Sequence, residues 1–206
     1  MTRTKICGIT RVEDGLACAS HGADAIGLVF YPPSPRCVAA ARAREIARAL
    51  PPFVTTVALF VNPAAAEVET ILREVRPDVL QFHGDEAPEF CAGFGVSWLK
   101  AVRVQAGLNL VEYAIRYRNA QGLLLDAYVE GQAGGTGQSF DWALIPAELP
   151  LPVVLSGGLD AGNVAAAIRQ VKPWAVDVSS GVEAAKGIKS EAKIAAFMQG
   201  VRNGSL

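Results

Sequence analysis

Eight short apolar runs, each ending in a glycine or a polar residue, most constrain the fold of this chain. Runs of this length and composition are typical of strands that are buried on both faces, as in a parallel sheet. We predict strands at residues 5–7, 25–30, 55–61, 79–83, 98–102, 123–126, 152–156 and 175–178.

Segments with a helical pattern separate the predicted strands. We predict helices at residues 10–21, 39–50, 64–75, 87–91, 108–118, 163–171 and 191–201. Thr10 is positioned to cap the first helix, and Asn62 followed by Pro63 has the composition of a helix start. Alternation at this short spacing predicts a (β/α)8 barrel, and spacing alone leaves a doubly wound open sheet as the alternative.

Composition limits the classes of function. The chain has 206 residues, of which 51% are hydrophobic and 19% charged, so we expect one domain with one large core over residues 1–206. The formal net charge of -1 gives no support to binding of nucleic acid or membranes, which favour a basic surface. No apolar run reaches the ~20 residues that span a bilayer. We therefore expect a soluble, cytoplasmic protein with a small-molecule partner.

The cysteines and histidines do not form a metal-binding pattern. Cysteines occur at positions 7, 18, 37 and 91 without a CxxC pair, and the histidines are His21 and His83. Metal sites and disulfide frameworks usually show close pairs, so we expect neither. The cysteines at 18, 37 and 91 do not align with a predicted strand end, and we interpret them as small hydrophobic residues.

Two residues at the carboxyl ends of predicted strands are candidates for proton transfer. Asp126 follows three leucines, and a carboxylate at the end of a buried strand has to offset its desolvation. A helix cap is the alternative for Asp126, although loop residues follow it. Cys7 ends the first strand and shares a face with Lys5, whose ammonium would favour the thiolate. A plain core position is the alternative for Cys7.

Other strand ends offer groups that bind anions. The loops at 156–158 and 179–181 follow the last two strands, where barrels of this type usually bind phosphate, and tight turns are the alternative. Arg36 and Arg103 follow two other strands, and each could be a solvated surface residue. Because prolines stiffen its loop, Arg36 is the stronger candidate for a bidentate clamp on a substrate carboxylate.

Two further features are expected on the same face. His83 and Asp85 follow the fourth strand and are candidates for a catalytic or an orienting role. The loop at 127–139 is unusually long and rich in small residues. Loops of this length in a compact domain are often lids, and we predict one here.

Nine motifs occur in one order along the chain. They lie at residues 5–10, 30–36, 61–63, 81–86, 100–103, 125–126, 134–137 with 140–142, 156–159 and 177–183. Together they cover essentially the whole chain, and in this order the sequence resembles the phosphoribosylanthranilate isomerases of tryptophan biosynthesis. Phe82 departs from the family pattern, in which an aliphatic residue is common at this position. No single motif would suffice, whereas nine in register are highly specific.

The resemblance implies an activity and a cofactor requirement. It implies a (β/α)8 barrel, without a metal or an organic cofactor, that catalyses the Amadori rearrangement of N-(5-phosphoribosyl)anthranilate. Asp126 would be the general acid on the ribose ring oxygen, and Cys7 the general base at C2 of the sugar. These roles need opposite protonation states at one pH. We therefore expect burial to keep Asp126 protonated and Lys5 to favour the thiolate of Cys7.

The resemblance also implies two anchors for the substrate. Arg36 would bind the anthranilate carboxylate at one end. At the other end the phosphate would be bound by Gly157, Gly158, Ser180 and Gly181. Supporting roles would fall to Lys5, His83, Asp85, Arg103 and Asp177.

Two rival functions stay open on the sequence. An isomerase for a histidine-pathway aminoaldose would keep the phosphate loops, but a pair of aspartates would replace Cys7 as acid and base. A phosphate-binding or regulatory barrel without chemistry is the other rival, and the presence of both Cys7 and Asp126 argues against it. We expect a monomer and leave a homodimer open.

Overall fold

The computed structural model describes residues 1–127 and 140–205, and within them eight parallel strands form a closed barrel. The strands are β1 (Arg3–Cys7), β2 (Ala25–Val29), β3 (Thr55–Phe60), β4 (Val79–Phe82), β5 (Trp98–Val104), β6 (Gly122–Ala127), β7 (Val153–Leu155) and β8 (Ala175–Val178). Each strand pairs with its neighbour in sequence, and β8 pairs with β1 to close the ring. The prediction of a (β/α)8 barrel is confirmed, because an open sheet has no such closing pair.

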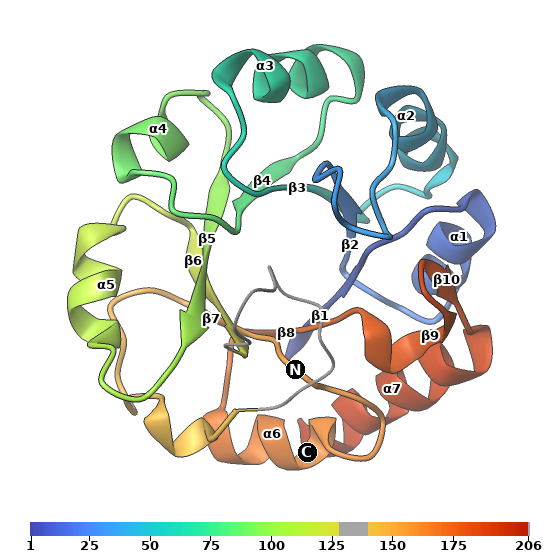
Figure 1. The fold of residues 1–206 in the computed structure, drawn as a ribbon. Helices are drawn as coiled ribbons and strands as arrows, with labels where there is room; N and C mark the ends of the chain where they lie inside the picture. Colours follow the sequence, from blue (N-terminus) through green and yellow to red (C-terminus); the bar gives the residue numbers. More distant parts are fainter. Residues whose placement is uncertain (128–139, 206) are drawn as a thin grey trace.

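Helices surround the barrel and cover its outer side (Figure 1). They are α1 (Val12–Ser20), α2 (Ala40–Ala49), α3 (Ala65–Glu74), α4 (Pro88–Ala92), α5 (Leu110–Arg116), α6 (Val164–Val171) and α7 (Glu191–Gly204). All the predicted helices exist, with ends that differ by a few residues. Between β6 and β7 the described residues contain only a short 3-10 helix, η1 (Trp142–Leu144). Within the described residues, no helix combines the length and the apolar character needed to cross a membrane.

The side chain of Asn62 does not start a helix, contrary to the prediction. Asn62 has a left-handed backbone with a φ of 48°, and its side-chain oxygen accepts a hydrogen bond from the N–H of Asp85. The residue that precedes α3 is Ala64, whose N–H donates to the Glu67 carboxylate at 2.7 Å. Asn62 therefore ties together the loops that follow β3 and β4.

A hairpin that the sequence patterns did not predict follows β8. It consists of the antiparallel strands β9 (Glu183–Ala185) and β10 (Ile188–Lys189). Thr10, the predicted cap of α1, makes no capping hydrogen bond and donates instead to the carbonyl oxygen of Gly187 in this hairpin. The hairpin is thereby attached to the segment that follows β1.

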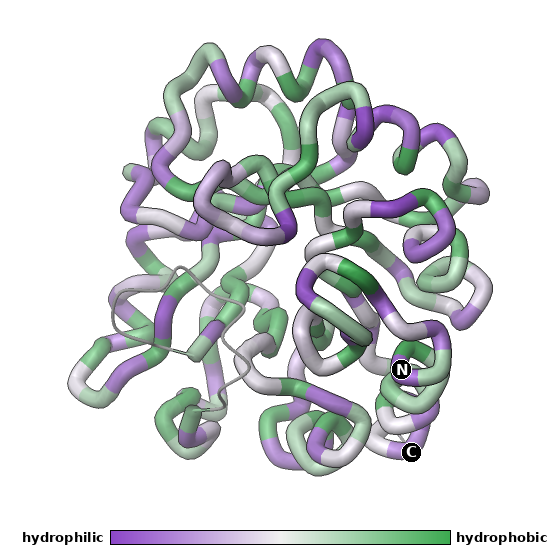
Figure 2. Tube along the Cα trace, turned by 45° about the vertical axis from the view of Figure 1, so that its right-hand side comes forward, coloured by the Kyte–Doolittle hydropathy of each residue, from purple (hydrophilic) through white to green (hydrophobic). Residues whose placement is uncertain are grey.

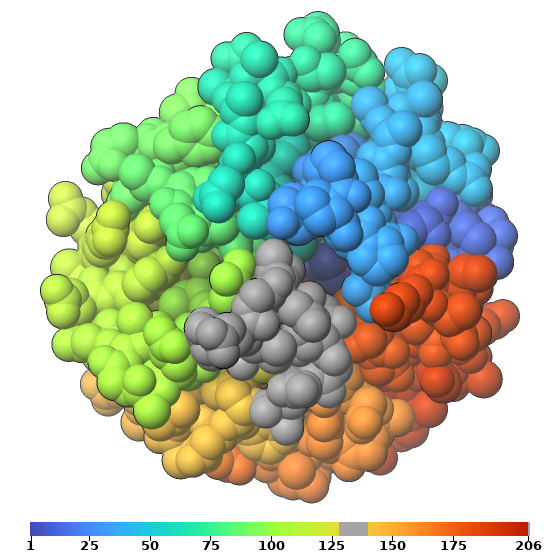
Figure 3. Space-filling model, in the orientation of Figure 1, coloured from blue at the N-terminus to red at the C-terminus, as the bar shows by residue number. Residues whose placement is uncertain are grey.

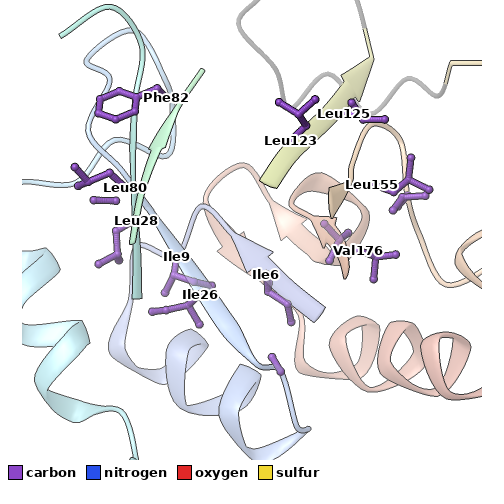
Figure 4. Close-up of a cluster of buried hydrophobic side chains, with 14 of the residues drawn as sticks. Ile6, Ile9, Ile26, Leu28, Leu80, Phe82, Leu123, Leu125, Leu155 and Val176 are labelled. Atoms are coloured by element: carbon purple, nitrogen blue, oxygen red, sulfur yellow. The ribbon is translucent and has the colours of Figure 1, made fainter. Parts of the chain in front are cut away.

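Alternation along each strand separates two layers of side chains. Leu123 and Leu125 point away from the barrel axis into the main core between strands and helices (Figure 4). Leu124, which lies between them, packs with Ala101 and Val154 in a separate cluster. Asp126 falls on the same side as Leu124, so β6 aims its carboxylate into the barrel. Along the surrounding helices, hydrophilic and hydrophobic stretches alternate, as amphipathic helices require (Figure 2).

The unusual Phe82 lies on the outer side of β4. It is fully buried and forms aromatic contacts with Phe60, Phe90, Phe94 and Trp98. This cluster fills the space between the barrel and α4. Because the side chain points away from the barrel interior, its identity affects packing rather than chemistry.

The predicted lid cannot be placed. Residues 128–139, which make up nearly all of it and include the glycine-rich motif at 134–137, lie outside the described residues. Ala127, its first residue, is the last residue of β6.

Candidate active site

A cavity that is partly open to solvent lies at the carboxyl ends of the barrel strands. Figure 3 shows this face, with a hollow in which the dark blue of the chain around β1 is visible. The predicted site residues that line the cavity are Cys7, Arg36, His83, Asp126, Gly157, Gly158, Asp177 and Ser180. Residues more than one hundred positions apart in the sequence are thus brought to one cavity. Among the described residues, no group of three His, Cys, Asp or Glu side chains could hold a metal ion.

Lys5, Asp85, Arg103 and Gly181 were also predicted site residues, and they do not line this cavity. Asp85 is exposed, and Arg103 lies within β5 rather than beyond its end. Arg103 is the register partner of Asp126 on β6, and the supporting roles of Asp85 and Arg103 stay predictions. A Cβ atom on Gly181 would collide with the carbonyl oxygen of Leu159. Glycine at 181 is therefore needed for the close approach of two loops.

Cys7 ends β1 directly above a buried ion pair. Lys5 and Asp177 are register partners on β1 and β8, and Lys5 Nζ lies 3.0 Å from Asp177 Oδ1. Burial disfavours the ammonium, but the Asp177 carboxylate outweighs burial and raises the pKa of Lys5. A Cβ on Gly27 would lie 2.6 Å from Cys7 Sγ, so glycine on the neighbouring strand makes room for the sulfur.

Burial is the largest influence on the Cys7 thiol. It raises the pKa of Cys7 above the ordinary value for a thiol, and Asp177 raises it further. Lys5 and Lys189 both lower it, but by less than burial raises it. Lys5 thus favours the thiolate, as predicted, but it does not outweigh burial, and the pKa of Cys7 is raised overall rather than lowered. Burial also raises the pKa of Cys18, which lies in α1, to about 12, and Lys189 opposes this shift by less.

Asp126 is held by hydrogen bonds. Its Oδ2 lies 3.2 Å from His83 Nε2, and its Oδ1 accepts from the N–H of Ala127 at 3.0 Å. His83 Nδ1 faces the amide nitrogen of Gln81 at 3.3 Å. Both ring nitrogens of His83 thus have a hydrogen-bonding partner, and the tautomer of the ring decides which of them donates. The chain Gln81, His83, Asp126 fixes the direction of the carboxylate.

Gln81 is a site residue that the sequence reasoning missed. It is fully buried, lines the cavity, and its Oε1 has no hydrogen-bond partner among the described residues. A buried acceptor without a partner is costly unless a ligand supplies a donor. Its spacing from His83 on one strand was the available signal, because residues two apart share a face.

The loops after β7 and β8 contribute Gly157, Gly158 and Ser180 to the lining of the cavity. Gly157 and Gly158 have positive φ values of 85° and 63°. A Cβ on Gly157 would lie 2.7 Å from the nitrogen of Ala127, so a side chain there would push against β6. Within the described part of the chain, the N–H groups of Gly157, Gly158 and Ser180 have no acceptor. Backbone donors that converge in this way can bind an anion.

Arg36 reaches the cavity from the loop after β2. Its Nε and Nη2 donate to the two carboxylate oxygens of Glu183 at 2.7 and 2.8 Å. Glu183 also accepts from Lys189 Nζ at 3.0 Å. Neither Glu183 nor Lys189 was identified as a partner of Arg36 from the sequence, although Glu183 lies in the motif at 177–183. An arginine that is already paired and still lines the cavity is a preorganised anion-binding group.

Comparison with known proteins agrees with this geometry. The family model of N-(5'-phosphoribosyl)anthranilate (PRA) isomerase matches residues 4–200. A relative from Nitrosospira multiformis, N-(5'-phosphoribosyl)anthranilate isomerase, is 59% identical over 199 residues, which are 97% of this chain and 96% of that protein.

Solved structures of the same family have the same fold. The phosphoribosyl anthranilate isomerase from Thermotoga maritima is 41% identical with a TM-score of 0.90, covering 98% of this chain and 99% of that chain. A phosphoribosyl anthranilate isomerase in complex with reduced 1-(o-carboxyphenylamino)-1-deoxyribulose 5-phosphate, also 41% identical, has a TM-score of 0.87 over the same shares. This chain belongs to the N-(5'-phosphoribosyl)anthranilate isomerase family.

Proposed function

We propose that the chain catalyses the Amadori rearrangement of N-(5'-phosphoribosyl)anthranilate to 1-(2-carboxyphenylamino)-1-deoxyribulose 5-phosphate in tryptophan biosynthesis. The single observation that carries the assignment of roles is that Cys7 and Asp126 line one cavity, with Arg36 and the two glycine-containing loops beside them. Membership of the family supports the reaction and its substrate. The reaction needs proton transfers only, so side chains of this kind suffice.

Asp126 acts first, as a general acid. It donates a proton to the ribose ring oxygen while the bond between that oxygen and C1 breaks. The lone pair of the anilino nitrogen forms the new double bond to C1, which gives an iminium ion. The hydrogen bond between His83 and Asp126 and the one from the N–H of Ala127 hold the carboxyl group toward the cavity during this step.

Cys7 acts second, as a general base. Its thiolate removes the proton from C2 of the sugar, and the electron pair of that C–H bond moves into a C1–C2 double bond. The iminium nitrogen recovers its lone pair, and the resulting enolamine tautomerises to the 2-ketone. Because burial raises the pKa of Cys7, the positive charges of Lys5 and Lys189 are needed to retain a usable fraction of thiolate.

Two anchors hold the substrate between the acid and the base. Arg36 binds the anthranilate carboxylate. The N–H groups of Gly157, Gly158 and Ser180 bind the phosphate, and Gly181 maintains the loop shape that presents Ser180. Fixing both ends of the substrate restricts the sugar to the space between Cys7 and Asp126, which lowers the entropic part of the barrier.

Turnover of the substrate tests the proposal directly. Phosphoribosylanthranilate is fluorescent, and its disappearance on addition of the purified protein measures the reaction. The same assay with a phosphorylated histidine-pathway aminoaldose tests the first rival, for which we expect no turnover. A chain that binds phosphorylated ligands but converts neither substrate would be the second rival, the barrel without chemistry.

Three further expectations belong to this proposal. Residues 1–206 act as one catalytic domain, and the protein works in the cytoplasm. We expect a monomer, which size-exclusion chromatography with light scattering would measure. The homodimer alternative has support from Phe53 and Trp174, two exposed aromatic residues beside a hollow at the amino ends of the strands.

A further inference from the structure

We propose that Glu183 is a positioning residue for the carboxylate end of the substrate, because it aims Arg36 into the cavity and, with Lys189, sets the charge of that end. This inference rests on the proposed function, since the carboxylate of the substrate defines what Arg36 would bind. Glu183 belongs to β9 of the hairpin, which is not one of the barrel strands.

The contacts of Arg36 leave one edge of the guanidinium available. Nε and Nη2 are bound by the two oxygens of Glu183, whereas Nη1 makes no hydrogen bond within the described residues. The side chain lines the cavity, and a Cβ on Gly8 would collide with its Cδ, so Arg36 lies across the turn after β1. Figure 3 shows the blue segment after β2 beside the red segment of the hairpin. Glu183 therefore fixes the orientation of the guanidinium and leaves its Nη1 edge available to a ligand in the cavity.

The charges of the cluster do not cancel. Arg36 and Lys189 are positive and Glu183 is negative, and these residues are only 8%, 4% and 7% exposed. Burial favours the neutral acid, but the hydrogen bonds from Arg36 and the charge of Lys189 outweigh it and lower the pKa of Glu183, so the residue stays ionised. Burial lowers the pKa of Lys189, and Glu183 opposes that shift. With Lys189 protonated and Cys7 a neutral thiol, the cluster has a surplus of one positive charge, which one anionic group stabilises. A singly charged carboxylate matches that surplus.

Glu183 is itself held from several sides. Its carboxylate accepts from the N–H of Gly187 at 3.3 Å, and its carbonyl oxygen accepts from Lys193 Nζ at 2.7 Å. Lys189 also donates to the carbonyl oxygen of Ser179 at 3.0 Å. A long arginine side chain loses much rotamer entropy when a ligand immobilises it. Because Glu183 already immobilises Arg36 in the free protein, binding of the ligand does not carry this entropy cost.

The test is a pair of ligands that differ only in the carboxylate. One is reduced 1-(o-carboxyphenylamino)-1-deoxyribulose 5-phosphate, and the other is the same reduced compound made with aniline in place of anthranilate. In the Glu183→Gln variant we expect affinity for the first to fall by about tenfold to a hundredfold, from lost charge-assisted hydrogen bonds that aim Arg36. Affinity for the second should stay within about threefold, and KM should rise more than kcat falls.

Matched variants separate an effect on the orientation of Arg36 from an effect on the fold. Lys186→Ala changes an exposed residue of the same hairpin and should leave both affinities unchanged. Glu183→Asp keeps the negative charge but moves the carboxylate away from Arg36. It should also lower the affinity for the first ligand selectively. The double variant with Arg36→Ala and Glu183→Gln should bind no more weakly than Arg36→Ala alone.

Several outcomes would overturn the proposal. If Glu183→Gln and Glu183→Asp lowered the affinity for both ligands equally, Glu183 would support the fold and not the orientation of Arg36. Unchanged affinity for the carboxylate ligand, or fully additive losses in the double variant, would also overturn it. Failure of the proposed function is distinguishable, because it would be seen in the parent protein as no turnover of phosphoribosylanthranilate and no affinity for either ligand.

Discussion

The two walls of the cavity hold their reactive groups by different means. The acid wall consists of Gln81, His83 and Asp126 on and after β4 and on β6, and hydrogen bonds connect its members. The base wall consists of Lys5, Cys7 and Asp177 on β1 and β8, and an ion pair lies beneath its thiol. The acid wall therefore controls the direction of the Asp126 carboxyl group, and the base wall controls the ionisation of the Cys7 thiol.

This difference follows from the chemistry of the two groups. A carboxyl group has two oxygens that accept well-directed hydrogen bonds, so neighbours can aim it. A thiol is a weak hydrogen-bond partner, and its use as a base depends on the fraction that is ionised. Changes in the acid wall should thus alter the rate at every pH, whereas changes in the base wall should move the pH dependence.

Removing either reactive group should have the largest effect. Asp126→Asn and Cys7→Ala should each lower kcat by about a hundredfold to ten-thousandfold, because each removes one proton-transfer group. Steady-state kinetics measures the loss, and thermal unfolding should show that both variants stay folded. If Cys7→Ala turned over nearly as fast as the parent, the base would have to be another group, and the two-wall comparison would fail.

Removing the carboxylate anchor should affect binding more than turnover. In Arg36→Ala, KM should rise by about tenfold to a hundredfold while kcat changes less, since the anchor acts on the substrate far from the reacting carbons. Initial rates over a range of substrate concentrations separate the two parameters. A loss confined to kcat would place Arg36 in the chemical step and contradict its role as an anchor.

A charge change in the base wall should move the pH profile. Lys5→Met removes a charge that lowers the pKa of Cys7, so that pKa rises further. A base is active when deprotonated, so the rising limb of kcat against pH should shift upward by about one unit, with about tenfold less activity on that limb.

A control variant tests the cause of that shift. Asp177 acts on the pKa of Cys7 in the opposite direction to Lys5. Adding Asp177→Asn to Lys5→Met should therefore reverse part of the shift and should also avoid an unpaired buried carboxylate. An unmoved profile in Lys5→Met would show that Lys5 does not influence the base.

A change in the acid wall should lower kcat without shifting the rising limb of the pH profile. His83→Ala removes the hydrogen-bonding partner of Asp126, so the carboxyl group loses its direction and kcat should fall by about tenfold. His83→Asn retains an N–H donor and should recover part of the loss. A shift of the rising limb in His83→Ala would mean that the two walls are not separate.

The smallest expected effect is at Gln81. Gln81→Leu removes the amide group that faces His83 Nδ1, and kcat should fall by a few-fold, less than in His83→Ala. Comparing the two variants in one kinetic series measures the contribution of each link in the chain. A larger loss in Gln81→Leu would indicate that its unpaired Oε1 contacts the substrate itself.

The fold was predictable because its signals are local. Apolar runs and helical spacing depend on neighbouring residues, and they predicted every barrel strand and every α-helix that the structure describes. The hairpin was not predictable from such signals, because β9 and β10 are very short and are held by contacts with Thr10 and Arg36 from the other end of the chain. The role assigned to Asn62 was wrong for the same reason, since its partner lies on another loop.

Most members of the candidate site were predictable, but Gln81 and the partnerships between the residues were not. The carboxyl ends of parallel strands in a barrel meet on one face, so Cys7, Asp126 and the two glycine-containing loops could be selected one at a time. The pairing of Lys5 with Asp177 joins residues 172 positions apart, and that of Arg36 with Glu183 joins residues 147 apart. No spacing rule along the chain reaches over such separations.

By itself, the sequence determined the order of elements, the residues at strand ends and the family. Tertiary structure alone decided that the ring closes, that Glu183 and Lys189 surround Arg36, and that the pKa of Cys7 is raised rather than lowered. The physical reason is that charge and burial act through space. Lys5 is a neighbour that the sequence reveals, whereas the amount of protein packed around a thiol depends on the whole fold.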